Sequence, residues 1–259
     1  MVALDGVALD IASRRLLDGI DVHVRPGEML AILGPNGVGK TTLLRAIAGL
    51  HPAARGTISI DGATITTLGA IARARRVALV TSDEVLLDAL RVRDVVAIGR
   101  YPHHRWWQWR QRVDDDAAIS GALSAVQLEP FAERLFATLS SGERQRVWLA
   151  LGIAQETPVL LLDEPTSHLD ARVAHQILAL LRDLARAGKT IVCVLHDLND
   201  AAAYADRLAL LAEGTLLGAA TPDEILSGPL LERTYGIAFE RVRLGDGRLR
   251  VFAAAAQHA

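Results

Sequence analysis

Short hydrophobic runs occur at three places along this chain, and a polar residue follows each of them. Runs of four or five aliphatic residues are typical of strands covered on both faces, as in a parallel sheet. Ligands of open parallel sheets lie beyond the carboxyl ends of the strands, so the polar residues predict a site at one sheet edge. The runs and the residues that follow them are Met29 to Leu33 with Gly34, Val159 to Leu162 with Asp163, and Ile191 to Leu195 with His196.

Hydrophobic positions three or four residues apart predict helices between these runs. Thr41 to Leu50 forms one such pattern, and Ala171 to Ala187 forms another that ends before Gly188. The stretch from Val85 to Gln155 lacks strong strand patterns and is predicted to be mostly helical. The pattern therefore predicts an α/β fold with a mostly parallel sheet and a helical insertion subdomain.

We expect a single domain over residues 1–259. Its core would comprise about residues 1–84 and 156–230, with the helical subdomain at about 85–155 and a C-terminal tail at 231–259. The Ala-rich end, from Ala253 to Ala256, is expected to fray.

Composition narrows the range of partners. The formal net charge is −2, so the chain lacks the basic field that attracts nucleic acid. Cys193 is the only cysteine and can form no internal disulfide. No hydrophobic run approaches the roughly 20 residues needed to cross a bilayer, and the residues from Met1 to Asp10 do not resemble a signal peptide. Any role at a membrane is therefore expected to depend on a partner.

A glycine-rich segment between the first run and the helix after it fits the phosphate-loop pattern G-x-x-x-x-G-K-[ST]. Its backbone N–H groups would surround a triphosphate, Lys40 would reach the β- and γ-phosphates, and the Thr41 hydroxyl would bind Mg²⁺. The simpler alternative is a chance glycine-rich turn. The predicted nucleotide contacts here are Gly34, Pro35, Asn36, Gly37, Val38, Gly39, Lys40, Thr41 and Thr42.

Two acidic residues follow the second hydrophobic run. Asp163 would hold Mg²⁺, and Glu164 would polarise the attacking water. An acidic loop after a buried strand is the alternative interpretation.

The segment from Leu139 to Arg146 predicts an exposed helix N-terminus. Ser140 and Glu143 form the S-x-x-E pattern of a capping box, and Gly142 leaves the first turn bare. Such a helix end can bind an anion. By spacing alone, an ordinary capped helix is the favoured interpretation.

These motifs together resemble the ATP-binding subunits of ATP-binding-cassette (ABC) transporters. The segment Leu139 to Glu143 is similar to the family's LSGGQ signature, with Ser141 in place of the first glycine and Glu143 in place of glutamine. Ser167 to Asp170 resembles the D-loop, and His196 resembles the switch histidine. The resemblance implies an ABC ATPase domain built on a phosphate-loop NTPase core, with Glu164 and His196 as its catalytic residues.

A narrower resemblance concerns importers of ferric siderophores, haem and vitamin B12. It rests on Gly99 to His103 and on Thr221 to Ile237. It implies ATP hydrolysis that powers import of an iron chelate, haem or corrinoid through separate integral membrane permease subunits, with a periplasmic substrate-binding protein in the full system. The chain would lie at the cytoplasmic face of the cell membrane as a peripheral protein.

The family resemblance also implies a homodimer. Two copies would meet head to tail, so that the phosphate loop of one copy and Ser140 and Gly142 of the other grip each ATP. Ser141, Glu143 and Asp170 would contribute to the same nucleotide contact.

Two positions depart from the family pattern. The family places an aromatic residue near the N-terminus to stack on adenine, and the aligned position here is Ile11. The family also carries a Mg²⁺-binding glutamine after the strand that aligns with Val77 to Val80. Ser82 aligns with it best, and Asp83 is the alternative.

Two other functions remain open from the sequence. One is an ABC ATPase without a transporter, which long coiled-coil insertions or a basic patch would favour. The other is a nucleotide switch with little turnover, which the missing aromatic and glutamine favour. The tryptophans Trp106, Trp107 and Trp109 would either line a groove for a permease helix or pack within the helical insertion.

Overall fold

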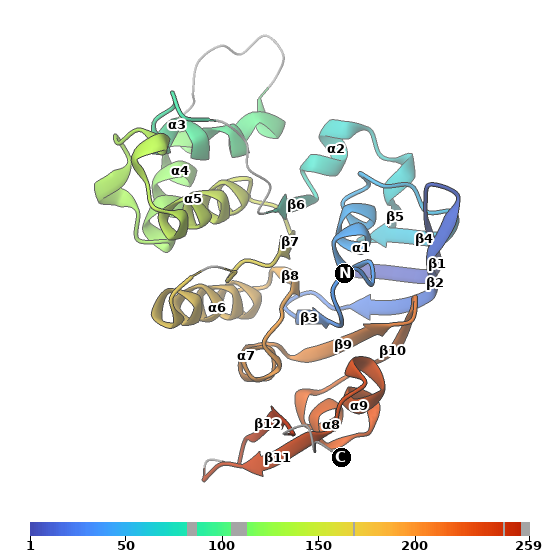
Figure 1. The fold of residues 1–259 in the computed structure, drawn as a ribbon. Helices are drawn as coiled ribbons and strands as arrows, with labels where there is room; N and C mark the ends of the chain where they lie inside the picture. Colours follow the sequence, from blue (N-terminus) through green and yellow to red (C-terminus); the bar gives the residue numbers. More distant parts are fainter. Residues whose placement is uncertain (82–86, 105–112, 168, 246, 255–259) are drawn as a thin grey trace.

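The computed structural model describes residues 1–81, 87–104, 113–167, 169–245 and 247–254 (Figure 1). The predictions for Ser82 and Asp83, and those for the tryptophans at 106, 107 and 109, lie outside these residues.

A six-stranded sheet forms the centre of the molecule, in the order β10-β9-β3-β8-β7-β6. Neighbouring strands are parallel except for β10, which pairs antiparallel with β9. The mostly parallel sheet predicted from the hydrophobic runs is therefore confirmed. The strands are β3 (Met29–Leu33), β6 (Val77–Val80), β7 (Val159–Asp163), β8 (Thr190–Val194), β9 (Arg207–Ala212) and β10 (Thr215–Ala220).

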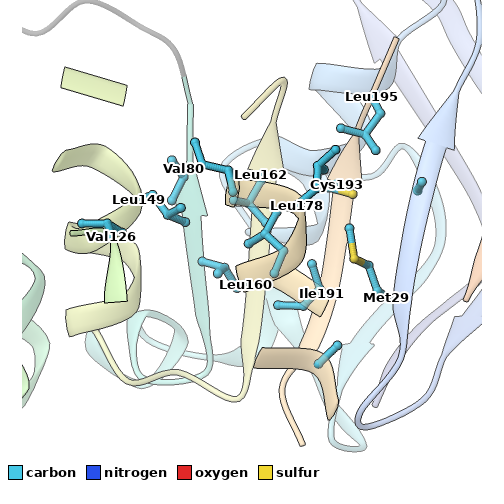
Figure 2. Packing of buried hydrophobic residues seen from close by; sticks show 14 of the residues in the cluster. Met29, Val80, Val126, Leu149, Leu160, Leu162, Leu178, Ile191, Cys193 and Leu195 are labelled. Atoms are coloured by element: carbon cyan, nitrogen blue, oxygen red, sulfur yellow. The ribbon is translucent and has the colours of Figure 1, made fainter. Parts of the chain in front are cut away.

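Both faces of this sheet are buried, which explains why its strands are continuously hydrophobic. On one face Leu160 and Cys193 pack with Leu178 of α6 (Ala171–Arg186) and with residues of the helical region (Figure 2). On the other face Leu161 and Val192 pack in a second core cluster. Residues that alternate along each strand thus enter different cores.

The second cluster lies under a four-stranded antiparallel sheet, in the order β2-β1-β4-β5, that the hydrophobic runs did not reveal. Helix α1 (Lys40–Ile47) contacts strands of both sheets. The pattern in the second strand could have shown this sheet, because buried Ile20, Val22 and Val24 alternate with exposed Asp21 and His23. The strands are β1 (Val2–Ile11), β2 (Arg14–Val24), β4 (Arg55–Ile60) and β5 (Ala63–Thr64).

Helices and short 3₁₀ turns occupy the described residues between β6 and β7, as the sequence predicted. They form a lobe beside the parallel sheet (Figure 1). The helices are α3 (Val92–Ala97), α4 (Val113–Ala125) and α5 (Ser141–Ala154), and the 3₁₀ turns are Ile98–His103, Glu129–Phe131 and Phe136–Thr138. Elsewhere there are α2 (Ala70–Ala74) and a 3₁₀ turn at Ile65–Thr67.

The chain after β10 packs onto the core. Leu231 and Val251 are both buried in the cluster that covers the parallel sheet. The carboxamide of Asn199 joins this region to α7, since it donates to the carbonyl of Val251 at 3.0 Å and accepts from its N–H at 2.9 Å. The elements are α7 (Leu198–Tyr204), α8 (Pro222–Ser227), α9 (Leu230–Tyr235), β11 (Phe239–Arg243) and β12 (Leu249–Ala253).

Two local predictions were wrong. The helix after the glycine-rich segment ends at Ile47, and Leu50 is 65% exposed beyond it. The chain turns at Gly49, whose φ of +69° a side chain rarely adopts. Of the segment Ala253 to Ala256 that was expected to fray, Ala253 is instead the last residue of β12, and Ala255 and Ala256 lie outside the described residues. Within the described residues, every helix is too short or too polar to cross a bilayer.

Candidate functional site

The glycine-rich segment from Gly34 to Gly39 joins β3 to α1 at the carboxyl edge of the parallel sheet. Gly34 has a φ of +150°, and a Cβ there would lie 2.1 Å from the carbonyl oxygen of Leu211. Gly39 caps α1 with a φ of +111°, and a Cβ there would lie 3.0 Å from a methyl carbon of Leu16. These glycines let the backbone turn tightly around an anion in front of the helix.

Lys40 is 6% exposed and lies inside this turn. Its Nζ donates to the carbonyl oxygens of Gly34 at 2.8 Å and Pro35 at 2.9 Å. An ammonium group has three N–H donors, so one remains for a phosphate oxygen. Burial lowers the pKa of Lys40, and the nearby carboxylates of Glu164 and Asp163 oppose this shift. The ammonium group of Lys40 therefore lies close enough to both carboxylates to interact with their charges.

Glu164 lies at the centre of a small polar cluster. His196 places its Nε2 2.6 Å from Oε1 of Glu164, and the hydroxyl of Ser167 donates to Oε2 at 3.0 Å. Both partners fix the carboxylate just beyond β7. The fold therefore brings Lys40, Asp163, Glu164 and His196 together from three separate strand ends, as the sequence predicted for this sheet edge.

Glu164 has a shifted pKa and an unusual backbone conformation in this cluster. Burial raises its pKa, but the hydrogen bonds from His196 and Ser167 and the charge of Lys40 outweigh burial and leave the pKa lowered. Its φ is +53°, an unusual value for a residue with a side chain. Such strain is found at functional sites, where surrounding contacts hold it in place.

Two oxygen donors at this edge suit a Mg²⁺ ion. Thr41 presents a hydroxyl in the first turn of α1, and Asp163 presents a carboxylate that is 7% exposed. Mg²⁺ prefers hard oxygen ligands and is commonly held by one or two protein groups together with phosphates. No group of three His, Cys, Asp or Glu side chains placed to hold a metal occurs within the described residues.

Helix α5 begins with the capping box that the sequence predicted. Oγ of Ser140 accepts from the N–H of Glu143 at 3.3 Å, and Oε2 of Glu143 accepts from the N–H of Ser140 at 2.7 Å. Hydrogen bonds from the backbone and side chain of Ser140 lower the pKa of Glu143. The glutamate carboxylate is thus engaged within its own chain, and its contact with a nucleotide stays a prediction.

A pocket of about 320 Å³ opens at this helix end, here called the signature pocket. Ser140 to Glu143 and Arg146 line one side, and Leu169, Asp170 and Val173 line the other. Asp170 caps α6 by accepting from the N–H of Val173 at 3.0 Å. The signature pocket shares no lining residue with the pocket at the phosphate loop, so the two motifs line separate pockets of one copy.

A larger pocket of about 600 Å³, here called the base pocket, adjoins the phosphate loop. Pro35 to Val38 form one wall, and the β1–β2 hairpin contributes Ile11, Arg14, Arg15 and Leu16. Ile11 is 47% exposed, as expected for a residue that contacts a ligand. The sequence interpretation missed the arginines and Leu16, although they lie three to five positions after the residue that aligns with the family's aromatic residue.

Comparison with known proteins decides the family. A profile described as ABC transporter matches residues 17–167, more than half of the chain. The chain belongs to the ABC transporter family. Membership makes it an ATPase, and the resemblance that the motifs carried is confirmed.

Curated relatives narrow the comparison. The chain is similar to the hemin import ATP-binding protein HmuV of Streptomyces coelicolor, with 44% identity over 91% of this chain and 83% of that protein. It is 41% identical to the ferric enterobactin transport ATP-binding protein FepC of Escherichia coli, over 85% of this chain and 81% of the relative.

Solved ABC structures share the fold. One is a chain of an inward-facing transporter described as metal-chelate type, with a TM-score of 0.85, 25% identity and 98% of each chain covered. Another is a dimeric post-hydrolysis ATP-binding cassette with ADP and phosphate, with a TM-score of 0.76, 27% identity, and 86% of this chain and 99% of that chain covered.

Two contacts near the site, made by Ser167 and Tyr235, were not evident from the motifs alone. Ser167 belongs to the predicted D-loop, but its hydrogen bond to Glu164 became clear only in three dimensions. Burial of Tyr235 of α9 raises the pKa of its phenol to about 12, and the nearby backbone of Gly34 opposes this shift. Tyr235 lies 201 positions from Gly34 in the chain, and no local pattern relates them.

Proposed function

We propose that this chain hydrolyses ATP to power import of haem or another iron chelate through a separate membrane permease. The observation that carries the proposal is the Glu164 carboxylate, held by His196 at 2.6 Å next to the buried ammonium group of Lys40. The relatives named for hemin and ferric enterobactin support the choice of cargo.

The proposed reaction is attack of water on the γ-phosphorus of ATP, which releases ADP and phosphate. Glu164 orients the water and accepts its proton, and its lowered pKa keeps it ready as an acceptor at neutral pH. His196 holds the carboxylate, while Lys40 stabilises the charge on the phosphate oxygens. Mg²⁺ held by Thr41 and Asp163 would neutralise charge on the β- and γ-phosphates.

We further propose that the working unit is a head-to-tail homodimer. The signature pocket lies apart from the phosphate loop of its own chain, and the α5 N-terminus at its rim is suited to an anion. A second copy can bring its own phosphate loop to this pocket. Hydrolysis then depends on closure of the two copies, which is the motion that would drive the permease.

The proposed partners are integral membrane permease subunits and, in the full system, a periplasmic substrate-binding protein. The chain would act as a peripheral protein on the cytoplasmic face of the membrane. Its helices are too short or too polar for a membrane span within the described residues, so another subunit would have to form the path through the bilayer.

Reconstitution with the membrane protein that co-purifies tests this function. In proteoliposomes that contain the full complex, we expect ATP to drive uptake of haem or of a ferric siderophore, and Glu164→Gln to abolish uptake. An ATPase rate that is the same with and without the membrane protein, and no uptake of either cargo, would instead identify an ABC ATPase without a transporter.

A further inference from the structure

The base pocket lacks an aromatic ring. Its lining residues all lie in the described part of the chain, and none of them is Phe, Tyr, Trp or His. Ile11, Leu16 and Val38 supply apolar contacts, but an aliphatic side chain has no flat face on which a base can stack. A stacking contact with the base must therefore come from another planar group.

The tip of the β1–β2 hairpin places one cation next to Ile11. Ile11 and Arg14 are paired directly across the two strands, so their side chains lie on the same face. The two residues that connect them, Ala12 and Ser13, have φ values of +45° and +67°. Tight turns of this form favour Asn and Gly, so the Ala-Ser pair is strained and the hairpin holds Ile11 and Arg14 together despite that strain.

The two arginines of the hairpin differ in what they already bind. Arg15 donates to the carboxylates of Asp10 and Asp18, so its guanidinium is already engaged. Arg14 is exposed, lines the same pocket and has no ion-pair partner among the residues that the structure describes. Its guanidinium is therefore available to a ligand.

We propose that the Arg14 guanidinium lies flat against the purine base of the bound nucleotide and replaces the missing aromatic ring. The inference rests on the proposed ATPase function and adds the residue that holds the base. Pro35 to Val38 form the opposite wall, so a nucleotide whose phosphates lie in the loop extends its base directly past this hairpin.

A guanidinium suits this role because it is planar, permanently charged and stacks on aromatic faces. It reads the π-face of a base rather than its hydrogen-bonding edge, so adenine and guanine are held alike. Lysine carries the same charge but has no plane to stack.

Binding titrations of the full chain test the inference, with EDTA present to prevent hydrolysis. Arg14→Ala should weaken ATP and GTP binding by about tenfold. It should change the affinity for inorganic tripolyphosphate, which has no base, by less than about twofold. Arg14→Lys should behave like Arg14→Ala, and Arg14→Trp should restore ATP affinity because it returns an aromatic face.

Arg55→Ala is the matched control, because it removes the same charge from an exposed side chain outside the base pocket. It should change ATP affinity by less than about twofold. Equal losses in the two alanine variants, or an equal loss for tripolyphosphate, would mean that Arg14 only attracts the phosphates and would overturn the inference. Failure of the wild-type chain to bind ATP even when Mg²⁺ is supplied would refute the proposed function instead.

Discussion

Glu164 carries most of the chemistry at the residue scale. It accepts hydrogen bonds from His196 and Ser167 and lies next to Lys40, and its backbone is held at a φ of +53°. Each of these contacts orients the carboxylate or keeps it charged. Glu164 itself does not hold the triphosphate, so substitution of Glu164 should affect turnover more than binding.

Glu164→Gln should leave ATP affinity nearly unchanged and lower the steady-state ATPase rate by a factor on the order of 10²–10⁴, because the amide cannot accept the proton of the attacking water. ATP should then accumulate a stable dimer, which size-exclusion chromatography detects. Lys40→Ala is the comparison, since it should weaken ATP binding itself. A Glu164→Gln variant that turns over at the wild-type rate would show that another residue activates the water.

Ser167→Ala should move the acidic limb of the pH–kcat/KM profile upward. The Ser167 hydroxyl is one of the groups that lower the pKa of Glu164, so the variant carboxylate takes up a proton at a higher pH. Because a depressed pKa keeps Glu164 ionised as pH falls, the wild type should retain activity further into the acid range. An acidic limb that does not move between the two proteins would assign the limb to a different group.

The nucleotide base should be poorly discriminated. Ile11 and Arg14 contact its faces rather than its edges, so GTP should compete with ATP within about tenfold, on the order of 1.4 kcal/mol. Competition binding with a labelled ATP analogue measures the ratio. A much larger preference for ATP would mean that a hydrogen-bonding group reads the adenine edge.

The N-terminus of helix α5 has two features. Its capping box stabilises the helix within its own chain, and its first turn lines the signature pocket. Capping by Ser140 contributes about 0.5–2 kcal/mol to helix stability whether or not a nucleotide binds there. Loss of activity in a single variant therefore cannot distinguish a cap from a nucleotide contact. Mixing two different defects can.

Lys40→Ala and Ser140→Arg should each inactivate their own homodimer. In a mixed dimer, the loop with Lys40→Ala faces the helix with Ser140→Arg, and the other site pairs an intact Lys40 with an intact Ser140. ATPase activity should therefore return in part when the two variants are mixed, because one complete site remains.

The control places both substitutions in one copy and pairs that copy with wild type. Each site then contains one defect, and activity should be lost. If this dimer is active and the mixed one is not, Ser140 serves the nucleotide of its own chain and the head-to-tail arrangement is wrong.

Elements could be predicted where a short stretch of consecutive residues determines them. The parallel strands carry continuous hydrophobic runs, and the phosphate loop and capping box lie within eight residues or fewer, so all of these were evident in the sequence. The antiparallel sheet was missed although Ile20, Val22 and Val24 alternate with polar residues. Leu50 was misplaced because its spacing continues the helical pattern, whereas Gly49, with a φ of +69°, turns the chain out of the helix just before it.

The whole molecule includes its C-terminal tail as part of one core. Leu231 is fully buried in the cluster that covers the parallel sheet, and the phenol of Tyr235 lies close to the backbone of Gly34. The tail therefore contributes to the stability of the sheet. The proximity of Tyr235 to Gly34 could not be predicted from a local pattern, because the two residues lie 201 positions apart in the chain.

Leu231→Ala should lower the free energy of unfolding by about 2–5 kcal/mol, since it removes a fully buried side chain and leaves a cavity. Thermal unfolding should remain a single transition at a lower Tm. Ile237→Ala is the matched control, because Ile237 is 47% exposed and its loss should change stability by about 0.5 kcal/mol or less. Equal Tm values for the two variants would show that the tail is not part of the cooperative unit.

The hydrogen bonds between Asn199 and Val251 have a genetic consequence. Asn199 follows His196 by three residues, so these hydrogen bonds connect β12 to the segment that carries the catalytic histidine. A nonsense codon just before Leu249 deletes that anchor and leaves the Asn199 carboxamide without its two backbone partners. In saturation mutagenesis under selection for uptake, alleles at Asn199 and at buried Val251 should be depleted, while those at Phe252, which is 53% exposed, should survive.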